Sequence, residues 1–453
     1  MRIAPQPGGL TLVLSYDPAR ARQILAQNRR RFGRRFFVNI AAETVEAEDE
    51  EGRLERYKVV TRTPEGEKTV VAVSLRNFLE RMVPQLEDSL VVMYGGPEAR
   101  RLGPPPLPRE TTALVLIVET MDDVPEGWER DVREVVEAYY ADEEETREAL
   151  GEAPRELRGV LLGELERLAR LPRERWAAEA DRMRATRLAI MGLGRMPPGP
   201  RLRDIPLDGY LRAHLLRHEA RPGCVVLTGA PGSGKTTVAR ALASAYGSWY
   251  ILDAGRVLER GRTNFLGHVL AELRHMGNVA LVVNELDHLV LAERRYMARL
   301  LSFLEENESA HIAGTVVDIS PLLREQSGTY HSELLRPGRV SEVVPVPPPF
   351  SREAREGVVR AVARSLGVEL DGRGARLVAG AAPLLYPSDY ISLVRRYAAE
   401  GAAALRAFAE TYDLEARAAS VEALVEKCER LGNTSTSLLD AIRDRLEDAL
   451  NWA

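Results

Sequence analysis

The sequence predicts an α/β protein with a parallel, three-layer sheet domain, a C-terminal all-helical lid subdomain and a separate N-terminal α/β domain. Between Leu202 and about Val346, apolar strand-like runs alternate with amphipathic helical segments, which is typical of a parallel sheet covered by helices. From Ser351 onward the spacing is helical almost throughout. Ahead of both regions, strand-like and helical signals alternate again, up to the linker-like segment Pro197–Pro200.

Composition narrows the class of protein. The chain has 453 residues, of which 45% are hydrophobic and 28% charged, as in ordinary soluble domains. No apolar run approaches the roughly 20 residues of a membrane span, and the N-terminus has no apolar signal core. The net charge of −5 gives no general attraction to nucleic acid or anionic lipid. We therefore expect a cytoplasmic protein without a membrane span and without nucleic acid as a partner.

The numbers of cysteines and histidines argue against a disulfide-stabilised protein and against a zinc-binding motif. Cys224 and Cys428 are the two cysteines, too few for a disulfide framework, and Cys224 opens an apolar strand as a small hydrophobic residue would. With seven histidines in addition, the sequence gives no zinc-ligand spacing. Four of the 62 basic residues are lysines, so a lysine at a special position is informative.

The N-terminal region divides at about residue 110. Residues 1–110 are predicted to form the α/β domain, and residues 111–200 a strand followed by helices and the proline-glycine linker. The expected strands are Thr11–Ser15, Arg35–Ile40, Val70–Val73 and Ala113–Val118; Ala19–Arg31 and several pieces of Trp128–Met196 are expected to be helical; and Glu43–Arg56 is an acidic loop or hairpin.

A phosphate-binding loop follows the predicted strand Cys224–Thr228. Gly229–Thr236 reads G-x-x-x-x-G-K-T and leads into a helix, which is the context that a P-loop requires. Its glycines let backbone N–H groups reach phosphate oxygens, Lys235 supplies a cation, and the Thr236 hydroxyl is a magnesium ligand. We expect ATP and Mg²⁺ here, bound by Gly229, Ala230, Pro231, Gly232, Ser233, Gly234, Lys235, Thr236 and Thr237. The alternative is a chance glycine-rich turn.

An acidic motif ends the next apolar run, Val279–Val283. The residues that follow are Asn284, Glu285, Leu286 and Asp287, and ligands of parallel sheets bind at the carboxyl ends of strands. Glu285 can activate the attacking water. Asn284 offers an amide oxygen at the metal position but no negative charge, which predicts weak Mg²⁺ binding and slow hydrolysis. The alternative is a strand end whose acidic side chains are simply solvated.

These motifs, together with Leu334-Leu-Arg-Pro-Gly-Arg339, resemble those of the AAA ATPase family over about Leu202–Tyr412. The resemblance implies that Arg336 and Arg339 act on the nucleotide of the neighbouring subunit, and hence a homo-oligomeric ring, usually of six. A guanidinium supplied in trans neutralises charge that develops on the γ-phosphate. The catalytic residues would then be Lys235, Glu285, Arg336 and Arg339. Alternatively, the two arginines cap a helix or pair with surface acids.

Three family features depart from the usual pattern. The polar residue of the strand after Glu285 is replaced by Asp318 or Ser320. The position of the pore loop falls near Glu259–Gly261, which has no aromatic residue, and Phe265–Gly267 sits too late and is expected to be helix core. Pro387-Ser388-Asp389 opens a helix of the implied lid but lacks the usual glycine-alanine pair before the aspartate, so the adenine contact stays open.

Two interpretations of the N-terminal half remain open. It is either an AAA-like module without a phosphate loop, as in plastid-encoded AAA proteins and their bacterial relatives, or an unrelated α+β adaptor domain. The basic segment Arg29–Arg35 is expected to be a helix end rather than a nucleic-acid contact, and the acidic run Glu46–Glu51 a solvated loop.

The predicted function is that of an ATPase. Residues 201–346 form its large subdomain, 347–412 the helical lid and 413–453 extra helices whose apolar stripes are core. The resemblance implies that hydrolysis remodels a protein client held by residues 1–200. The alternatives are an ATP-binding switch or scaffold with vestigial hydrolysis, and a DNA-associated motor, which the acidic net charge disfavours.

Overall fold

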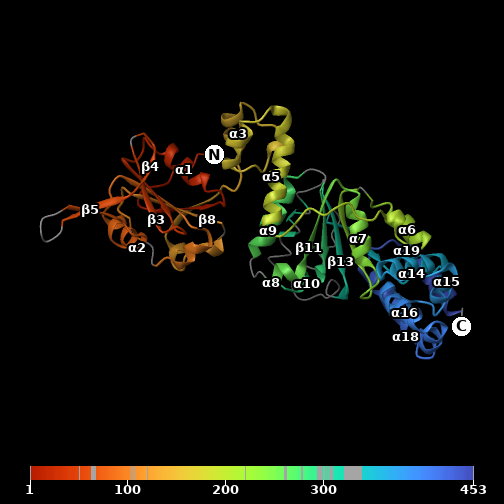
Figure 1. The fold of residues 1–453 in the computed structure, drawn as a ribbon. Coiled ribbons are helices and arrows are strands. Elements are labelled where there is room, and N and C mark those ends of the chain that lie inside the picture. The colour runs from red at the N-terminus through yellow and green to blue at the C-terminus, as the bar shows by residue number, and fades with distance from the viewer. Residues whose placement is uncertain are drawn as a thin grey trace. The chain divides into compact units, whose positions relative to one another are not determined.

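The computed structural model describes residues 2–49, 51–62, 68–103, 106, 108–119, 121–219, 221–259, 263–276, 279–292, 299–300, 302–303, 305, 310–320 and 339–451. The chain forms two compact units, Met1–Arg184 and Ala185–Ala453, and each contains its own sheet of mostly or wholly parallel strands (Figure 1). The boundary between them lies within helix α5 (Trp176–Ile190).

Unit 1 is built on a seven-stranded sheet. Apolar side chains fill both of its faces: α1 supplies Ala21, Ile24 and Leu25 to one face, and Phe78 and Trp128 belong to the core on the other. The strands are β1 (Leu10–Leu14), β2 (Arg34–Asn39), β3 (Thr44–Glu48), β4 (Leu54–Arg56), β7 (Ser89–Tyr94), β8 (Ala113–Val118) and β9 (Val132–Glu137), with a separate hairpin of β5 (Lys58–Arg62) and β6 (Lys68–Ala72). The helices are α1 (Ala19–Gln27), α2 (Leu75–Asn77), α3 (Glu143–Leu150), α4 (Leu162–Leu168) and the first part of α5.

The predicted division of the N-terminal half at residue 110 is wrong. β8 lies in the middle of the sheet, between β7 and β1, and β9 pairs with β1 on its other side. A sheet cannot be cut between hydrogen-bonded strands, so the unit continues to Arg184. The expected strands at Thr11–Ser15, Arg35–Ile40 and Ala113–Val118 are confirmed within one residue, and the acidic segment Glu43–Arg56 contains the hairpin of β3 and β4.

The segment Pro197–Pro200 is not a free linker between domains. The Trp249 indole Nε1 donates to Pro197 O at 3.1 Å, Met196 N donates to Trp249 O at 3.0 Å, and Ser244 Oγ donates to Pro200 O at 2.9 Å. The segment is therefore fixed against unit 2, and the boundary between the units precedes it.

Unit 2 holds a five-stranded parallel sheet with helices on its faces. Its largest core contains the buried strands together with α7 and α9. The strands are β10 (Gly223–Thr228), β11 (Ser248–Asp253), β12 (Val279–Asn284), β13 (His311–Val316) and β14 (Val340–Pro345); the helices of this part are α6 (Gly209–Leu215), α7 (Lys235–Ser244), α8 (Ala254–Glu259), α9 (Thr263–Arg274) and α10 (Leu286–Ala292).

The two sheets share one order of parallel strands. In unit 2 the sheet order is β11-β12-β13-β10-β14. Counted along this unit, these are its second, third, fourth, first and fifth strands. The parallel strands of unit 1 lie in the same order, as β2-β7-β8-β1-β9, with β3 and β4 added antiparallel at the β2 edge. In such sheets the order reverses beside the first strand, which is where ligands bind.

The C-terminal region is all-helical, as predicted. α14 (Arg352–Ser365), α15 (Gly372–Ala379), α16 (Pro387–Glu400) and α17 (Ala402–Ala409) are held together by a core of their own. α18 (Leu414–Leu431) and α19 (Thr436–Leu450) instead share the core of the sheet, to which they contribute Val421, Val425 and Ile442. Their apolar stripes are therefore core, as expected.

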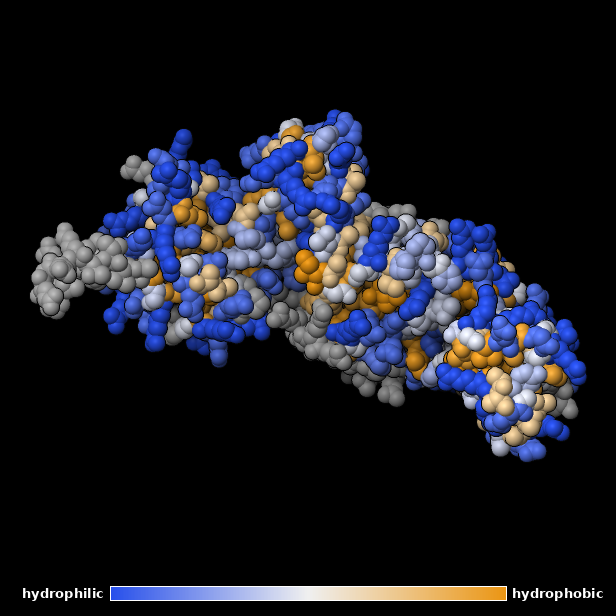
Figure 2. Space-filling model, in the orientation of Figure 1, coloured by the Kyte–Doolittle hydropathy of each residue, from blue (hydrophilic) through white to orange (hydrophobic). Residues whose placement is uncertain are grey.

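On the face drawn in Figure 2, hydrophilic and hydrophobic residues are interspersed. Among the helices that the structure describes, none is long and apolar enough to cross a membrane.

Candidate nucleotide-binding site

The glycine-rich loop lies between β10 and α7, at the carboxyl edge of the sheet. β10 ends at Thr228 and α7 begins at Lys235. Gly229 (φ 154°) and Gly234 (φ 94°) have backbone angles that side chains with a Cβ rarely adopt. At Gly229 an added Cβ would also lie 2.7 Å from Val346 O, so the turn requires glycine.

The helical lid touches this loop directly. Ser388, the second residue of α16, donates its backbone N–H to Gly232 O at 3.3 Å. A Cβ at Gly232 would lie 2.1 Å from Ser388 Oγ, so only glycine permits this contact. The start of α16, predicted from Pro387-Ser388-Asp389, is confirmed, and its first turn is adjacent to the phosphate loop.

Lys235 is folded into the loop that it follows. Its ammonium Nζ donates to Gly229 O at 2.8 Å and to Ala230 O at 2.9 Å, and the residue is 8% exposed. Burial lowers the pKa of Lys235, and the nearby Asp287 carboxylate opposes that effect. The ammonium is therefore placed inside the ring of backbone groups that would enclose phosphate oxygens.

Four buried oxygen atoms around the loop have no hydrogen-bond partner within the described part of the chain. They are Thr228 Oγ1, Ser233 Oγ, Asn284 Oδ1 and Asp287 Oδ1. Thr228 ends β10 and Asn284 ends β12, so both point to the same edge of the sheet. Leaving a buried polar atom unpaired costs about 1–3 kcal/mol. The group fits a hydrated cation and phosphate oxygens, which would supply the missing partners.

The magnesium ligands expected from the sequence fit this arrangement. Thr236 is the second residue of α7, and Asn284 Oδ1 is the unpaired oxygen at the end of β12. Bound Mg²⁺ would neutralise charge on the phosphates. Asp287 was assigned no role from the sequence, yet it is 7% exposed, influences Lys235 and accepts a hydrogen bond from Val317 N at 3.3 Å. It therefore adds the buried negative charge that Asn284 lacks.

Glu285 occupies a backbone conformation that is unfavourable for a non-glycine residue. Its φ is 55°, and such left-handed positions cost on the order of 1–3 kcal/mol and gather at functional sites. The Glu285 backbone N–H donates to Thr315 Oγ1 on β13 at 3.1 Å, which helps to hold it there. Its carboxylate is half exposed, with His288 Nδ1 3.5 Å from Oε2. Thr315 had no signal in the sequence beyond its place in an apolar strand.

Of the two predicted arginines, Arg339 lies within the described residues and Arg336 lies outside them. Arg339 Nε donates to Glu305 Oε1 at 2.8 Å, and the two side chains form an ion pair of 2.6 Å. Arg339 immediately precedes β14, whose first residue Val340 pairs with Cys224 at the start of β10. Because the phosphate loop follows the other end of β10, the structure separates Arg339 from this chain's own loop.

The remaining predicted positions fall in three places. Asp318 Oδ1 accepts from Ser320 N at 2.9 Å and from Lys427 Nζ at 3.0 Å, so both candidate polar residues belong to one network after β13. Phe265–Gly267 is part of α9, where Leu266 is fully buried, and the prediction of helix core is confirmed. Glu259 ends α8, and Arg260 and Gly261 lie outside the described residues.

Comparison with known proteins identifies one region that resembles a known family. Residues 225–348 match the model of the ATPase family associated with various cellular activities (AAA). No curated protein matches the sequence. Among solved structures, the chain is similar to one reported in "Structural Basis for Katanin Self-Assembly", with 16% identity, a TM-score of 0.39, and coverage of 57% of this chain and 96% of that one. It is also similar to the FIGL-1 AAA domain, with 14% identity, a TM-score of 0.40, and coverage of 58% and 95%. The matched residues contain the phosphate loop, the acidic motif and β14, so the region 225–348 is similar to the ATPase domain of the AAA family.

Proposed function

We propose that the chain binds ATP with Mg²⁺ at Gly229–Thr237 and hydrolyses it at subunit interfaces of a homo-oligomer, in order to remodel a partner protein. The main observation behind the proposal is the position of the Lys235 ammonium. The ammonium donates to the loop carbonyls and is influenced by the Asp287 carboxylate, and four buried oxygens in or directly before the loop and at or just after the end of β12 lack partners among the described residues. A polyphosphate with its metal ion would satisfy all of these groups at once.

The chain's own residues divide the work of hydrolysis. The loop amides and Lys235 bind the phosphates, and Thr236 and Asn284 hold the metal. Glu285, fixed by Thr315, accepts a proton from the attacking water. Ser388 couples the lid to the loop, because its backbone bonds Gly232.

The position of Arg339 supports an oligomer. It precedes the first residue of β14, whereas the loop follows the last residue of β10, so the strand separates them by at least roughly 13 Å. Arg339 therefore serves a neighbour's nucleotide rather than its own. The Arg339 side chain is 13% exposed and its partner Glu305 53%, so a subunit contact would have to draw Arg339 out of this ion pair. A ring, usually of six in this family, brings each Arg339 to the next subunit's loop.

Unit 1 is best interpreted as an AAA-like module that has lost its nucleotide site. It repeats the strand order of unit 2, but β1 is followed by Tyr16 and Asp17 instead of a glycine-rich loop. Arg20, at the start of α1, is fully buried and bonds Glu145 Oε1 at 2.5 Å and Tyr140 O at 2.7 Å. The Arg20 guanidinium, which follows the first strand of unit 1, is thus bonded within the protein. We assign the client-binding role to this unit and expect one nucleotide per chain.

Replacing Lys235 with alanine tests the proposal. We expect ATP affinity to fall roughly 30- to 5000-fold, because losing one partner of a buried charged contact costs about 2–5 kcal/mol. Calorimetry with ATP and Mg²⁺ measures the loss, and wild type should bind one nucleotide per chain. Lys58→Ala removes an exposed lysine of unit 1 and serves as the matched control. Unchanged affinity in folded Lys235→Ala protein would refute the assignment.

A second candidate function is a nucleotide-binding switch, which the uncharged Asn284 favours. Asn284→Asp adds a carboxylate at the metal position. Because hydrogen bonds to charged groups exceed neutral ones by about 1–1.5 kcal/mol, we expect the half-maximal Mg²⁺ concentration for hydrolysis to fall roughly tenfold. The Mg²⁺ dependence of steady-state hydrolysis measures this shift, and Asn77→Asp, an exposed change in unit 1, is its control. If wild type binds ATP yet turns over no faster than Glu285→Gln, the protein is a switch.

A further inference from the structure

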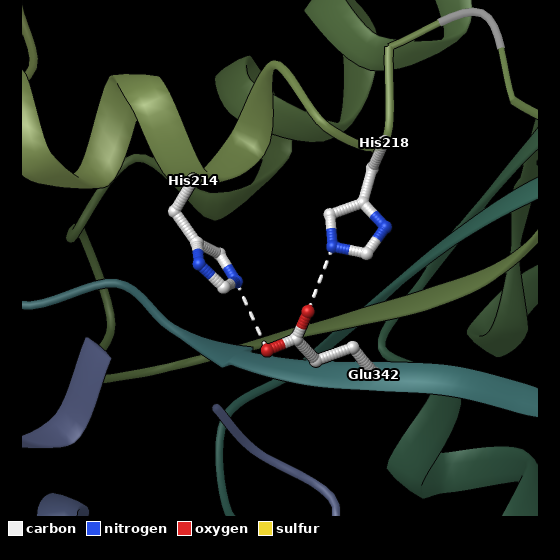
Figure 3. A group of neighbouring side chains, drawn as sticks. All are labelled: His214, His218 and Glu342. Carbon is white, nitrogen blue, oxygen red and sulfur yellow. Dashed lines mark hydrogen bonds and ion pairs between the residues drawn. The ribbon is translucent and has the colours of Figure 1, made fainter. Parts of the chain in front are cut away.

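Two histidines and a glutamate from distant parts of the sequence meet at the outer strand of the unit 2 sheet. His214 lies in α6, His218 in the turn after it, and Glu342 on β14 (Figure 3). Both imidazole rings point toward the same carboxylate. His214 Nε2 lies 2.9 Å from Glu342 Oε1, and His218 Nε2 lies 2.7 Å from Oε2.

The three side chains are sheltered but reachable from solvent. The side chains of His214, His218 and Glu342 are 7%, 18% and 13% exposed. One ligand atom from each residue lies within 4.8 Å of the other two.

We propose that His214, His218 and Glu342 bind one divalent transition-metal ion of the Zn²⁺ type. Two imidazole nitrogens and one carboxylate oxygen form a ligand set that suits zinc, with water completing a tetrahedron. Bond lengths of roughly 2.1 Å place the ligand atoms of a tetrahedral site about 3.4 Å apart. The contact between His218 Nε2 and Glu342 Oε2, now 2.7 Å, would need to lengthen by about 0.7 Å.

An outer contact already orients the carboxylate. Ser435 N, directly before α19, donates to Glu342 Oε1 at 2.9 Å. Partners of this kind fix metal ligands and support their affinity. This leaves Oε2, the oxygen beside His218, available as the metal ligand. A bound ion would then link α6, β14 and the start of α19, three segments far apart in the chain.

The site is separate from the nucleotide. Glu342 pairs with Val225, near the start of β10, whereas the phosphate loop follows the end of that strand. The ion would therefore cross-link the outer strand β14 to α6. Arg339 immediately precedes this strand. Sequence reasoning gave no zinc spacing because Glu342 is far away in the chain, although His214 and His218 are one helical turn apart.

The test uses the full chain, freed of metal with a chelator and then titrated with Zn²⁺ in the presence of excess Mg²⁺ and without nucleotide. We expect one Zn²⁺ per chain and a rise in melting temperature of about 5–10 °C at a hundredfold excess over Kd. Loss of an outer partner weakens metal sites roughly 10- to 100-fold, so loss of a ligand should weaken this one by about 100-fold. The ligand variants are His218→Gln, whose position is the more exposed of the two histidines, and Glu342→Gln.

His275→Gln removes a histidine elsewhere in unit 2 and should leave the titration unchanged. Co²⁺ in place of Zn²⁺ reports geometry, because a tetrahedral site gives intense visible absorption that octahedral Co²⁺ lacks. Calorimetry with ATP confirms that each variant is folded. Absence of stoichiometric Zn²⁺ binding by wild type overturns the proposal, as does wild-type affinity in both ligand variants. In either case the three residues form a hydrogen-bonded group only.

Discussion

Arg339→Ala is expected to lower the ATPase rate of the assembled protein about 10³-fold or more, while ATP affinity changes little. An arginine supplied in trans contributes roughly 10³- to 10⁵-fold to phosphoryl transfer, since it neutralises charge that appears only in the transition state. In one chain Arg339 is paired with Glu305 and lies beyond the opposite end of β10 from the loop. Steady-state hydrolysis and ATP calorimetry on the same preparation separate the rate from binding.

Mixing two inactive variants tests whether the arginine acts between subunits. Lys235→Ala lacks the loop cation but retains Arg339, and Arg339→Ala retains the loop. In a mixed ring, roughly a quarter of the interfaces pair an intact loop with an intact arginine, so activity should return. Arg352→Ala, which removes an arginine from an exposed pair with Glu356, is the control and should hydrolyse ATP as wild type does. Failure of the mixture to recover activity, although mixed oligomers form, would argue that Arg339 acts within its own chain or only structurally.

The parts of the fold that the sequence predicted are those with strong local patterns. Buried strands such as Ala113–Val118 are continuous apolar runs, and they appear where expected. β9 was missed because the apolar residues of Val132–Glu137 stand at positions 132, 135 and 136, the i, i+3, i+4 spacing of a helix, and this outer strand has little burial. The boundary at residue 110 was misplaced for a related reason: strand pairing is non-local, and β8 joins β1 from a hundred residues away.

In the candidate site, too, residues of a continuous motif could be predicted, whereas residues that act through distant contacts could not. The phosphate loop is one continuous motif, so its residues could be named in advance. Thr315 and Ser388 gain their roles only through contacts with Glu285 and Gly232, which lie far from them in sequence. Nothing in an apolar strand marks one threonine as the acceptor for a strained backbone N–H. The shared strand order of the two units is likewise a property of pairing rather than of sequence pattern.

Glu285→Gln should bind ATP as wild type does and hydrolyse it roughly 10²- to 10⁴-fold more slowly. The glutamine keeps the shape of the side chain but cannot accept a proton, and a positioned general base contributes about this factor. The backbone of residue 285 stays held by Thr315, so binding geometry is preserved. Single-turnover hydrolysis with calorimetric Kd values measures both quantities, and Glu422→Gln, an exposed change in α18, is the control.

The two possible outcomes for Glu285→Gln separate an enzyme from a switch. If the variant loses turnover but retains ATP, the Glu285 carboxylate is the group that activates the attacking water. Under the proposed function, client release follows hydrolysis, so the ATP-loaded variant is expected to hold a client longest. It should recover that client from cell extract where Lys235→Ala, which cannot load ATP, does not. If turnover is unchanged, another group activates the water. Asp287 is then the residue to replace, because it is a buried carboxylate that interacts electrostatically with Lys235.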